Sequence, residues 1–289
     1  MMRAVVKEAR PKQWVKNLLV FAAPGAAGVL TEAGPLSRTV IMFVAFCLAS
    51  AGTYYWNDIL DVASDRAHPV KRNRPIASGA IPLNAARVIG TGLLLCGVGL
   101  SFTTNWHGGV VCVGYVLLTL TYSVIWKHIA VVDLVAVAGG FVLRAIAGAQ
   151  AADVPMSSWF VLVTTFGSLF IVTGKRYAEL SELGDAPPVT RATLEDYSLG
   201  YLRTVLSVSC GATLVAYCIW AFEAAGATDS RWPLYQLSIV PMLTALLRYV
   251  LILEQGHGAA PEEIFLADRT LQILGLLWVV VFATGVYVS

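Results

Sequence analysis

Three aspartates at helical spacing, Asp58, Asp61 and Asp65, carry the strongest chemical signal in the sequence. On a helix, positions i, i+3 and i+7 lie on one face, so the three carboxylates would point the same way. Asn57 lies one turn from Asp61 and adds a neutral oxygen. Like charges on one stripe repel each other, and Mg²⁺, which takes oxygen ligands and shares them with phosphates, relieves that repulsion. The pattern predicts a magnesium site for a substrate that carries a diphosphate; a solvated acidic helix end is the alternative.

Cationic residues follow the aspartates directly. The segment 68–79 contains Lys71, Arg72 and Arg74. Lysine and arginine beside a metal site can bind the remaining phosphate oxygens. The prolines and the glycine of this segment indicate a shaped loop. For any one of these cations, an ordinary positively charged cytoplasmic loop is the alternative.

Other polar residues interrupt or border apolar segments. Lys127 lies in a tight turn between two such segments, with Tyr122 shortly before it, and we interpret both as substrate-binding. Lys16 and Asn17 open the first apolar segment and are expected to point into the same cavity. Arg144 lies deep in an apolar segment, where a charge is costly unless it faces the bundle interior and is paired with an anion or an acid.

A second polar cluster ends the sixth apolar segment and consists of Lys175, Arg176, Tyr177 and Glu179. It corresponds in position to the aspartate motif, but its charge balance is positive. We predict that Lys175 and Arg176 bind phosphate; a cluster that only orients the chain in the membrane is the alternative. Nearby acids leave a second metal site open: Glu179, Glu182 and Asp185.

The composition indicates which elements must position these residues. Of the 289 residues, 57% are hydrophobic and only 13% are charged, and the mean hydropathy is +0.70. About a quarter of the residues are charged in a soluble domain, so the excess apolar surface here must face lipid. We therefore predict an all-α polytopic membrane protein with a single domain, residues 1–289. The net charge of +2 and the lack of a basic tail indicate no nucleic-acid partner.

Nine segments are long and apolar enough to span a bilayer, which takes about 20 residues each. They are residues 14–31, 36–56, 82–104, 107–126, 129–150, 156–174, 199–224, 233–253 and 268–288. No cleavable signal peptide precedes them, so the N-terminus is expected in the cytoplasm. Lysine and arginine concentrate on that same side, which predicts a multi-pass plasma-membrane protein whose cavity and active site face the cytoplasm.

The motif Asn57-Asp58-x-x-Asp61-x-x-x-Asp65 and the polar segment after the sixth span resemble those of the UbiA superfamily of intramembrane prenyltransferases. The resemblance covers essentially the whole chain and implies a bundle of nine transmembrane helices. Typical members also have a second aspartate cluster around a Tyr-Ala pair. This chain keeps the Tyr-Ala pair at 177–178 but replaces the aspartates by basic residues and a glutamate.

That departure, together with segments 10–17 and 68–75, resembles one branch of the superfamily. The resemblance implies a Mg²⁺-dependent transferase that moves 5-phosphoribose from 5-phosphoribosyl 1-diphosphate to a polyprenyl (decaprenyl) phosphate, for arabinan synthesis in the cell wall. Three anionic groups on the two substrates would explain the basic second motif. A homo-oligomer is compatible with the sequence. The alternatives are prenyl transfer from a prenyl diphosphate to an aromatic or haem acceptor and, from another class, a transporter.

Overall fold

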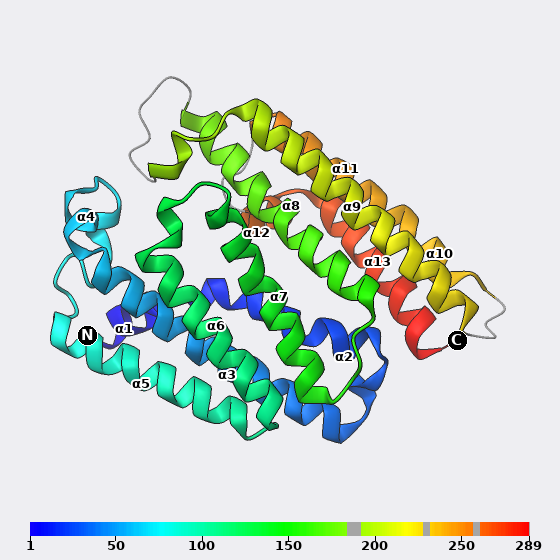
Figure 1. The fold of residues 1–289 in the computed structure, drawn as a ribbon, viewed down its shortest axis with the longest axis horizontal. Helices are drawn as coiled ribbons and strands as arrows, with labels where there is room; N and C mark the ends of the chain where they lie inside the picture. Colours follow the sequence, from blue (N-terminus) through cyan, green and yellow to red (C-terminus); the bar gives the residue numbers. More distant parts are fainter. Residues whose placement is uncertain (184–191, 228–231, 257–260, 289) are drawn as a thin grey trace. The chain divides into compact units, whose positions relative to one another are not determined.

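The computed structural model describes residues 1–183, 192–227, 232–256 and 261–288, and every regular element within them is a helix (Figure 1). This agrees with the predicted all-α class. Contacts divide the chain into two compact units, Met1–Pro155 and Met156–Ser289, and each is described by itself. That residues 1–289 act as one domain stays a prediction.

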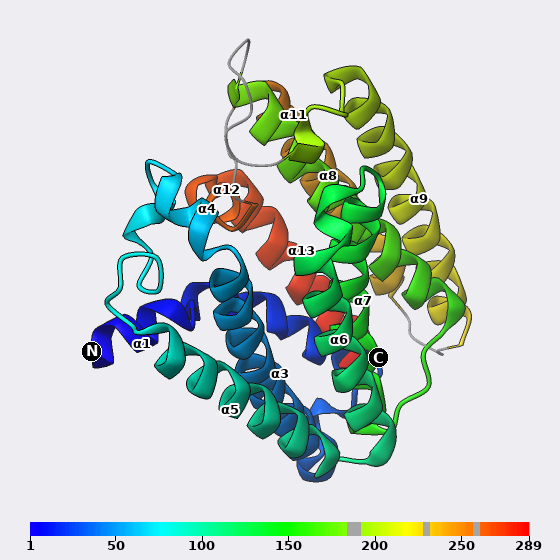
Figure 2. The same ribbon diagram turned by 60° about the vertical axis from the view of Figure 1, so that its left-hand side comes forward.

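The first unit combines four long helices with short elements that precede or join them. The long helices are α3 (Ala33–Leu60), α5 (Leu83–Phe102), α6 (Trp106–Val124) and α7 (Val132–Ala152). The short elements are α1 (Met2–Glu8), the 3-10 helix η1 (Pro11–Phe21), α2 (Ala22–Ala26), η2 (Val29–Thr31), α4 (Val62–Ala67), η3 (Lys71–Asn73) and η4 (Trp126–His128). Helix α3 packs against α5, α6 and α7, so it is the central helix of this unit (Figure 2).

The second unit is built from four long helices, a short helix, α10, that directly precedes the third of them, and short connections. They are α8 (Ser158–Leu183), η5 (Ala192–Leu194), α9 (Leu199–Gly226), α10 (Leu234–Leu237), α11 (Ile239–Glu254), α12 (Pro261–Ala267) and α13 (Arg269–Tyr287). Helix α8 packs along α9, and α11 packs along α13. Side chains cap two of these helices, since Ser198 accepts a hydrogen bond from Tyr201 N–H and Asp268 accepts one from Leu271 N–H.

Eight helices in the described part of the chain are long and apolar enough to cross a membrane. They correspond to eight of the nine predicted segments. The remaining segment, residues 14–31, is divided among η1, α2 and η2, so the count of nine is not confirmed. Pro24 lacks a backbone N–H, and Gly28 adopts a left-handed conformation (φ 74°), so a continuous helix is interrupted here.

Close approach of backbones brings α3 and α5 together. A Cβ added at Gly97 would lie 2.7 Å from the backbone nitrogen of Ala49, and one at Gly90 would lie 2.9 Å from the Cβ of Tyr55. Larger residues at these two positions would force the helices apart. Because the aspartate motif is at the end of α3, this packing also fixes where that end lies.

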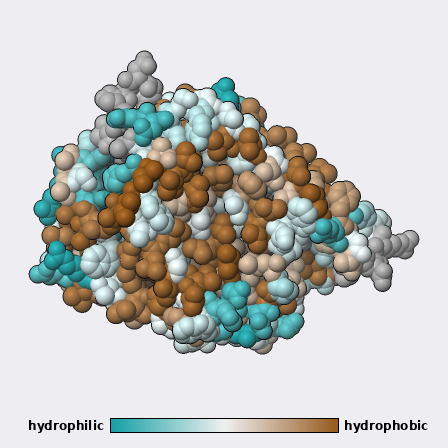
Figure 3. Space-filling model, in the orientation of Figure 1, coloured by the Kyte–Doolittle hydropathy of each residue, from teal (hydrophilic) through white to brown (hydrophobic). Residues whose placement is uncertain are grey.

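Large apolar side chains cover much of the molecular surface. Leu95, Leu117 and Leu276 are each more than half exposed. Figure 3 shows that apolar residues dominate much of the visible face, with polar residues nearer its margins. A surface of this kind is stable in lipid rather than in water, in agreement with the eight apolar helices.

Candidate active site

Helix α3 ends inside the aspartate motif, and α4 continues it almost without a break. Asp61 is the C-cap of α3 (φ −90°, ψ 5°), and its carbonyl accepts a hydrogen bond from the Asp65 N–H at 2.8 Å. This i, i+4 bond carries the helical path across the junction. Asp58 and Asp65 are buried, whereas Asp61 is partly exposed.

One arginine joins two carboxylates of the motif. Arg74 Nη1 donates to Asp58 Oδ1 at 3.1 Å and to Asp65 Oδ2 at 2.7 Å. Because a single nitrogen reaches both, these two carboxylates lie on one face, as their spacing predicts. Asn57 Nδ2 also lies 3.3 Å from Asp58 Oδ1, so the motif's amide is next to its first carboxylate.

A second arginine reaches the motif from the N-terminal segment. Arg10 Nη2 lies 2.7 Å from each carboxylate oxygen of Asp58, and its guanidinium lies over the Tyr54 ring at 5.0 Å from the centroid. Burial lowers the pKa of Arg10, but the charge and the hydrogen bond of Asp58, together with the nearby Glu8, outweigh burial and raise the pKa above its ordinary value. The backbone of Arg10 is left-handed (φ 50°), which is uncommon for a residue with a Cβ.

The third carboxylate pairs with a lysine from the turn between α6 and α7. Lys127 Nζ donates to Asp61 Oδ1 at 2.5 Å, and both side chains are partly exposed. The structure thus brings together two predicted site residues that are 66 positions apart in the sequence. Each of the three motif aspartates therefore has a cationic partner.

An apolar cluster supports this polar end of the first unit. Ile76 and Ile81 are fully buried and anchor the loop that carries Arg74. The Tyr55 hydroxyl donates to the Val5 carbonyl at 3.0 Å and ties α1 to α3. The positions of the loop and of α1 are therefore determined by packing beneath the site.

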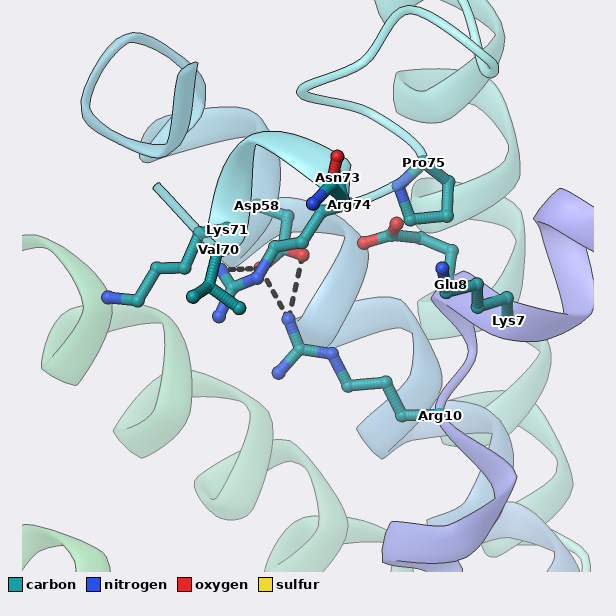
Figure 4. Close-up of a pocket in the computed structure, with 9 residues that line it drawn as sticks. All are labelled: Lys7, Glu8, Arg10, Asp58, Val70, Lys71, Asn73, Arg74 and Pro75. Carbon is teal, nitrogen blue, oxygen red and sulfur yellow. Dashed lines mark hydrogen bonds and ion pairs between the residues drawn. The ribbon is translucent and has the colours of Figure 1, made fainter. Parts of the chain in front are cut away.

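The charged groups around Asp58 line a cavity of about 390 Å³ (Figure 4). Its lining consists of Lys7, Glu8, Arg10, Asp58, Val70, Lys71, Asn73, Arg74 and Pro75. Four of these side chains are basic and two are acidic. The lining is therefore suited to a compact anion with several oxygens, such as a phosphate or diphosphate.

The sequence interpretation missed Glu8, the last residue of α1. Glu8 is only 1% exposed, and neither of its carboxyl oxygens has a hydrogen-bond donor in the described part of the chain. Burial, followed by the effect of the adjacent Asp58 carboxyl, raises the pKa of Glu8 to about 8. Arg10 was also absent from the predicted site residues. The hint in the sequence is that Arg10 opens segment 10–17, which carries part of the family resemblance, and that Glu8 lies two residues before it.

The residues at this cavity fit a divalent cation that is shared with a substrate. Mg²⁺ is usually held by one or two carboxylates together with substrate phosphates. Asp58 and Glu8 supply carboxyl oxygens at the cavity, and those of Glu8 are not hydrogen-bonded. Across the described ranges, no group of three or more His, Cys, Asp or Glu side chains is gathered closely enough to hold an ion by itself. The chain fits a metal–diphosphate complex better than a caged ion.

Two predicted ligands form a buried network within the first unit. Arg144 is 6% exposed, and its Nε donates to Asn17 Oδ1 at 2.8 Å. Its other nitrogens donate to the Gly140 carbonyl at 2.8 Å and to the Tyr115 hydroxyl at 2.9 Å. Neutral oxygens thus satisfy this arginine, in place of the expected anion or acid. The network ties η1 to α7, and neither residue lines the cavity.

The remaining predicted residues of the first unit have varied positions. Lys71 lines the cavity, whereas Arg72 is exposed and does not. Lys16 donates to the Gln13 side chain. Tyr122 is partly buried on α6.

The second polar cluster lies on α8 in the second unit. Arg176 is 2% exposed and pairs with Glu179 at 3.1 Å, while Lys175 Nζ lies 4.0 Å from the same carboxylate. The Tyr177 hydroxyl accepts a hydrogen bond from Arg203 at 3.1 Å. The structure therefore groups all four predicted residues at this end of α8. Asp185, which the sequence left open as a metal ligand, lies outside the described residues.

Comparison with known proteins identifies relatives of the whole chain. It is 41% identical to a decaprenyl-phosphate phosphoribosyltransferase of Corynebacterium glutamicum, over 98% of this chain and 87% of that protein. It is also 41% identical to the decaprenyl-phosphate phosphoribosyltransferase of Mycolicibacterium smegmatis, over 99% of this chain and 93% of that protein.

The fold is shared with a solved structure. A UbiA homolog from Archaeoglobus fulgidus bound to DMAPP and Mg²⁺ superimposes with a TM-score of 0.74 at 16% identity, covering 98% of each chain. Residues 18–276 match the UbiA prenyltransferase family. With its eight apolar helices, this multi-pass membrane protein belongs to the UbiA prenyltransferase family.

Proposed function

We propose that this protein transfers 5-phosphoribose from 5-phospho-α-D-ribose 1-diphosphate to a polyprenyl phosphate such as decaprenyl phosphate. The products are the polyprenyl-phosphoryl β-D-5-phosphoribose and diphosphate. The near-full-length similarity to two bacterial decaprenyl-phosphate phosphoribosyltransferases supports the proposal. A supply of phosphoribose for cell-wall arabinan is the role that this product would serve.

The charge of the cavity lining is the observation that carries the proposal. Lys7, Arg10, Lys71 and Arg74 outnumber the two acids there. A sugar with a diphosphate at C1 and a phosphate at C5 brings more negative charge than a prenyl diphosphate does. A basic lining beside the aspartate motif therefore favours the phosphosugar as the donor.

The aspartate motif serves the leaving group in this mechanism. Asp58, Asp61 and Asp65, with Asn57, would hold Mg²⁺ jointly with phosphate oxygens of the donor, and the bound ion would supply positive charge to the leaving diphosphate. The arginines and the lysine that pair with the carboxylates are partly exposed, so they can turn to phosphate oxygens when the substrate enters. Substrate binding thus exchanges ion pairs within the protein for ion pairs with the substrate.

The acceptor needs little activation. A phosphate monoester has a second pKa of about 6, so its oxygen is already largely ionised at neutral pH and no strong general base is required. Loss of diphosphate gives the ribose C1 oxocarbenium character, and attack from the opposite face converts the α anomer to β. The prenyl tail remains in lipid, because it cannot enter water.

Residues outside the cavity lining complete the proposal. Lys127, which pairs with Asp61, would bind a phosphate oxygen after leaving that carboxylate. Lys175 and Arg176 on α8 stay our predicted ligands for a further phosphate. In the predicted topology, lysine and arginine concentrate on the side of the membrane where the N-terminus lies. This distribution supports a plasma-membrane protein with its active site in the cytoplasm.

A direct assay tests this function. Purified protein in detergent is given phosphoribosyl diphosphate labelled in the ribose, decaprenyl phosphate and Mg²⁺, and lipid-extractable label is measured. Labelled lipid is expected from the wild type and from Asp196→Asn, an exposed control, but not from Asp58→Asn. The proposal is refuted if only a prenyl diphosphate and an aromatic acceptor react. Turnover without a vesicle gradient also excludes a transporter.

A further inference from the structure

Glu8 is a buried acid to which no side chain or backbone group in the described residues donates a hydrogen bond. Its side chain is 1% exposed, and neither Oε1 nor Oε2 has a hydrogen-bond partner in the described ranges. Buried carboxyl groups are nearly always hydrogen-bonded or paired, because desolvation without a partner is costly. The exception occurs at the lining of the charged cavity, so it points to a ligand that binds there.

The position of Glu8 is fixed by the fold. Helix α1 packs through Ala4 and Val5 against the apolar cluster under the aspartate motif, and Tyr55 holds the Val5 carbonyl at 3.0 Å. After the helix, the Trp14 indole donates to the Ala9 carbonyl at 3.0 Å. The residues on both sides of Glu8 are therefore anchored, and the burial of its side chain is a property of the packing.

The carboxyl groups of Glu8 and Asp58 face each other. Figure 4 shows the Glu8 carboxyl turned towards that of Asp58, with the Arg10 side chain coming from below. Arg10 Nη2 is within 2.7 Å of both Asp58 oxygens, so its charge is directed at Asp58 rather than at Glu8. Two acids are thus adjacent, and within the described residues only Asp58 has an ion pair.

A small hard cation between the two acids would satisfy both. It would remove their mutual repulsion and would provide the partner that Glu8 lacks. The basic groups on the rest of the lining then remain for phosphate oxygens. We propose that Glu8, which lies outside the aspartate motif, binds the divalent cation of the diphosphate site together with Asp58, so that helix α1 forms part of the active site.

This inference rests on the proposed function, and a metal-binding measurement tests it independently of turnover. Mn²⁺ is titrated into the purified full-length protein in detergent, with inorganic diphosphate present. Free Mn²⁺ is followed by its electron paramagnetic resonance signal. Glu8→Gln keeps the shape of the side chain but removes the charge, and Glu8→Asp keeps the charge. Glu32→Gln is the matched control, because Glu32 is an exposed acid of the same unit.

The expected result is a loss of Mn²⁺ affinity by about tenfold or more in Glu8→Gln, as for removal of a group that tunes or binds a metal. Glu8→Asp should retain more affinity than Glu8→Gln, and Glu32→Gln should bind as the wild type does. Thermal unfolding in EDTA identifies any variant that is misfolded. Wild-type affinity in folded Glu8→Gln overturns the inference.

Asp58→Asn distinguishes the proposed metal site itself from the proposed role of Glu8 at that site. If Asp58→Asn loses Mn²⁺ binding while Glu8→Gln does not, only the role of Glu8 is refuted. If neither substitution changes Mn²⁺ binding, the metal site itself is refuted, and the inference is refuted with it.

Discussion

Replacement of Arg74 by methionine tests whether ion-pair exchange operates in this site. Arg74 Nη1 lies between Asp58 and Asp65, at 3.1 and 2.7 Å from their carboxylates. The methionine retains an apolar stem of similar reach but provides no donor. Asp65 then loses its cationic partner while it remains 3% exposed, and Asp58 keeps only Arg10.

The expected loss of unfolding free energy in Arg74→Met follows from the burial of the ion pairs and from their number. Breaking a buried ion pair costs about 3–5 kcal/mol, because a charge is left without compensation. Arg74 is 28% exposed, so water can reach part of the site, and we expect a smaller loss of about 2–3 kcal/mol in unfolding free energy. For a domain of this size, that loss corresponds to a decrease in Tm of roughly 4–12 °C.

Arg74→Met should change the affinity for Mn²⁺ and the affinity for diphosphate in opposite directions. Without Arg74, the carboxylates are more negative and no guanidinium competes for them, so Mn²⁺ alone should bind more tightly than to the wild type. Diphosphate should bind more weakly, because one of its cationic ligands is gone. In the presence of EDTA the variant should be less stable, and added Mn²⁺ should reduce the difference.

The assay is thermal unfolding in detergent with EDTA or with Mn²⁺, combined with calorimetric titration of Mn²⁺ and of diphosphate. Arg87→Met is the control, because Arg87 is exposed and donates to the neutral side chain of Asn84. An Arg74→Met protein that unfolds like the wild type in EDTA would show that the ion pairs contribute no stability. An equal or weaker affinity for Mn²⁺ alone would refute the exchange of partners.

Three further outcomes are expected. Lys127→Met should raise KM for phosphoribosyl diphosphate while shifting stability by less than about 1 kcal/mol, because its pair with Asp61 is partly exposed; an unchanged KM would argue against a phosphate contact. Arg144→Met should lower Tm by leaving Asn17 Oδ1 buried without its donor, a cost of about 1–3 kcal/mol, and normal unfolding would contradict the network. The folded-state pKa of Glu8 is raised from 4.5 to about 8, so the metal-free folded protein binds this proton more tightly than the unfolded chain does. Its stability should therefore fall as pH rises from about 5 to 8, and Glu8→Gln should show a shallower fall in EDTA melts; parallel curves would refute the assignment.

Local patterns predicted part of the arrangement of the candidate site. The spacing of Asp58 and Asp65 indicated a shared face, and their common partner Arg74 confirms it. The charge of Arg144 inside an apolar segment indicated a buried, paired arginine, and the structure shows one, although its partners are neutral oxygens. In each case a periodicity of a few residues, or the cost of a charge in an apolar segment, is sufficient for the inference.

Long-range packing decided what those patterns could not. The pairing of Lys127 with Asp61 joins residues 66 positions apart, and no local rule specifies it. The break of the predicted first span into short elements depends on Pro24 and Gly28 and on the contact of η1 with α7 at Gly148. Hydropathy averages over a window and does not detect such interruptions.

By itself, the sequence determined the helical membrane class and the shared face of the acidic motif, because composition and spacing are properties of the chain alone. Only the tertiary structure decided that Glu8 and Arg10 meet Asp58. The contact between Arg10 and Asp58 spans 48 positions and depends on α1 packing over an apolar cluster from other elements. In the unfolded chain, the Glu8 side chain can take many solvated positions. Burial of α1 against the apolar cluster fixes the folded position, in which Glu8 is buried and faces Asp58 at the cavity.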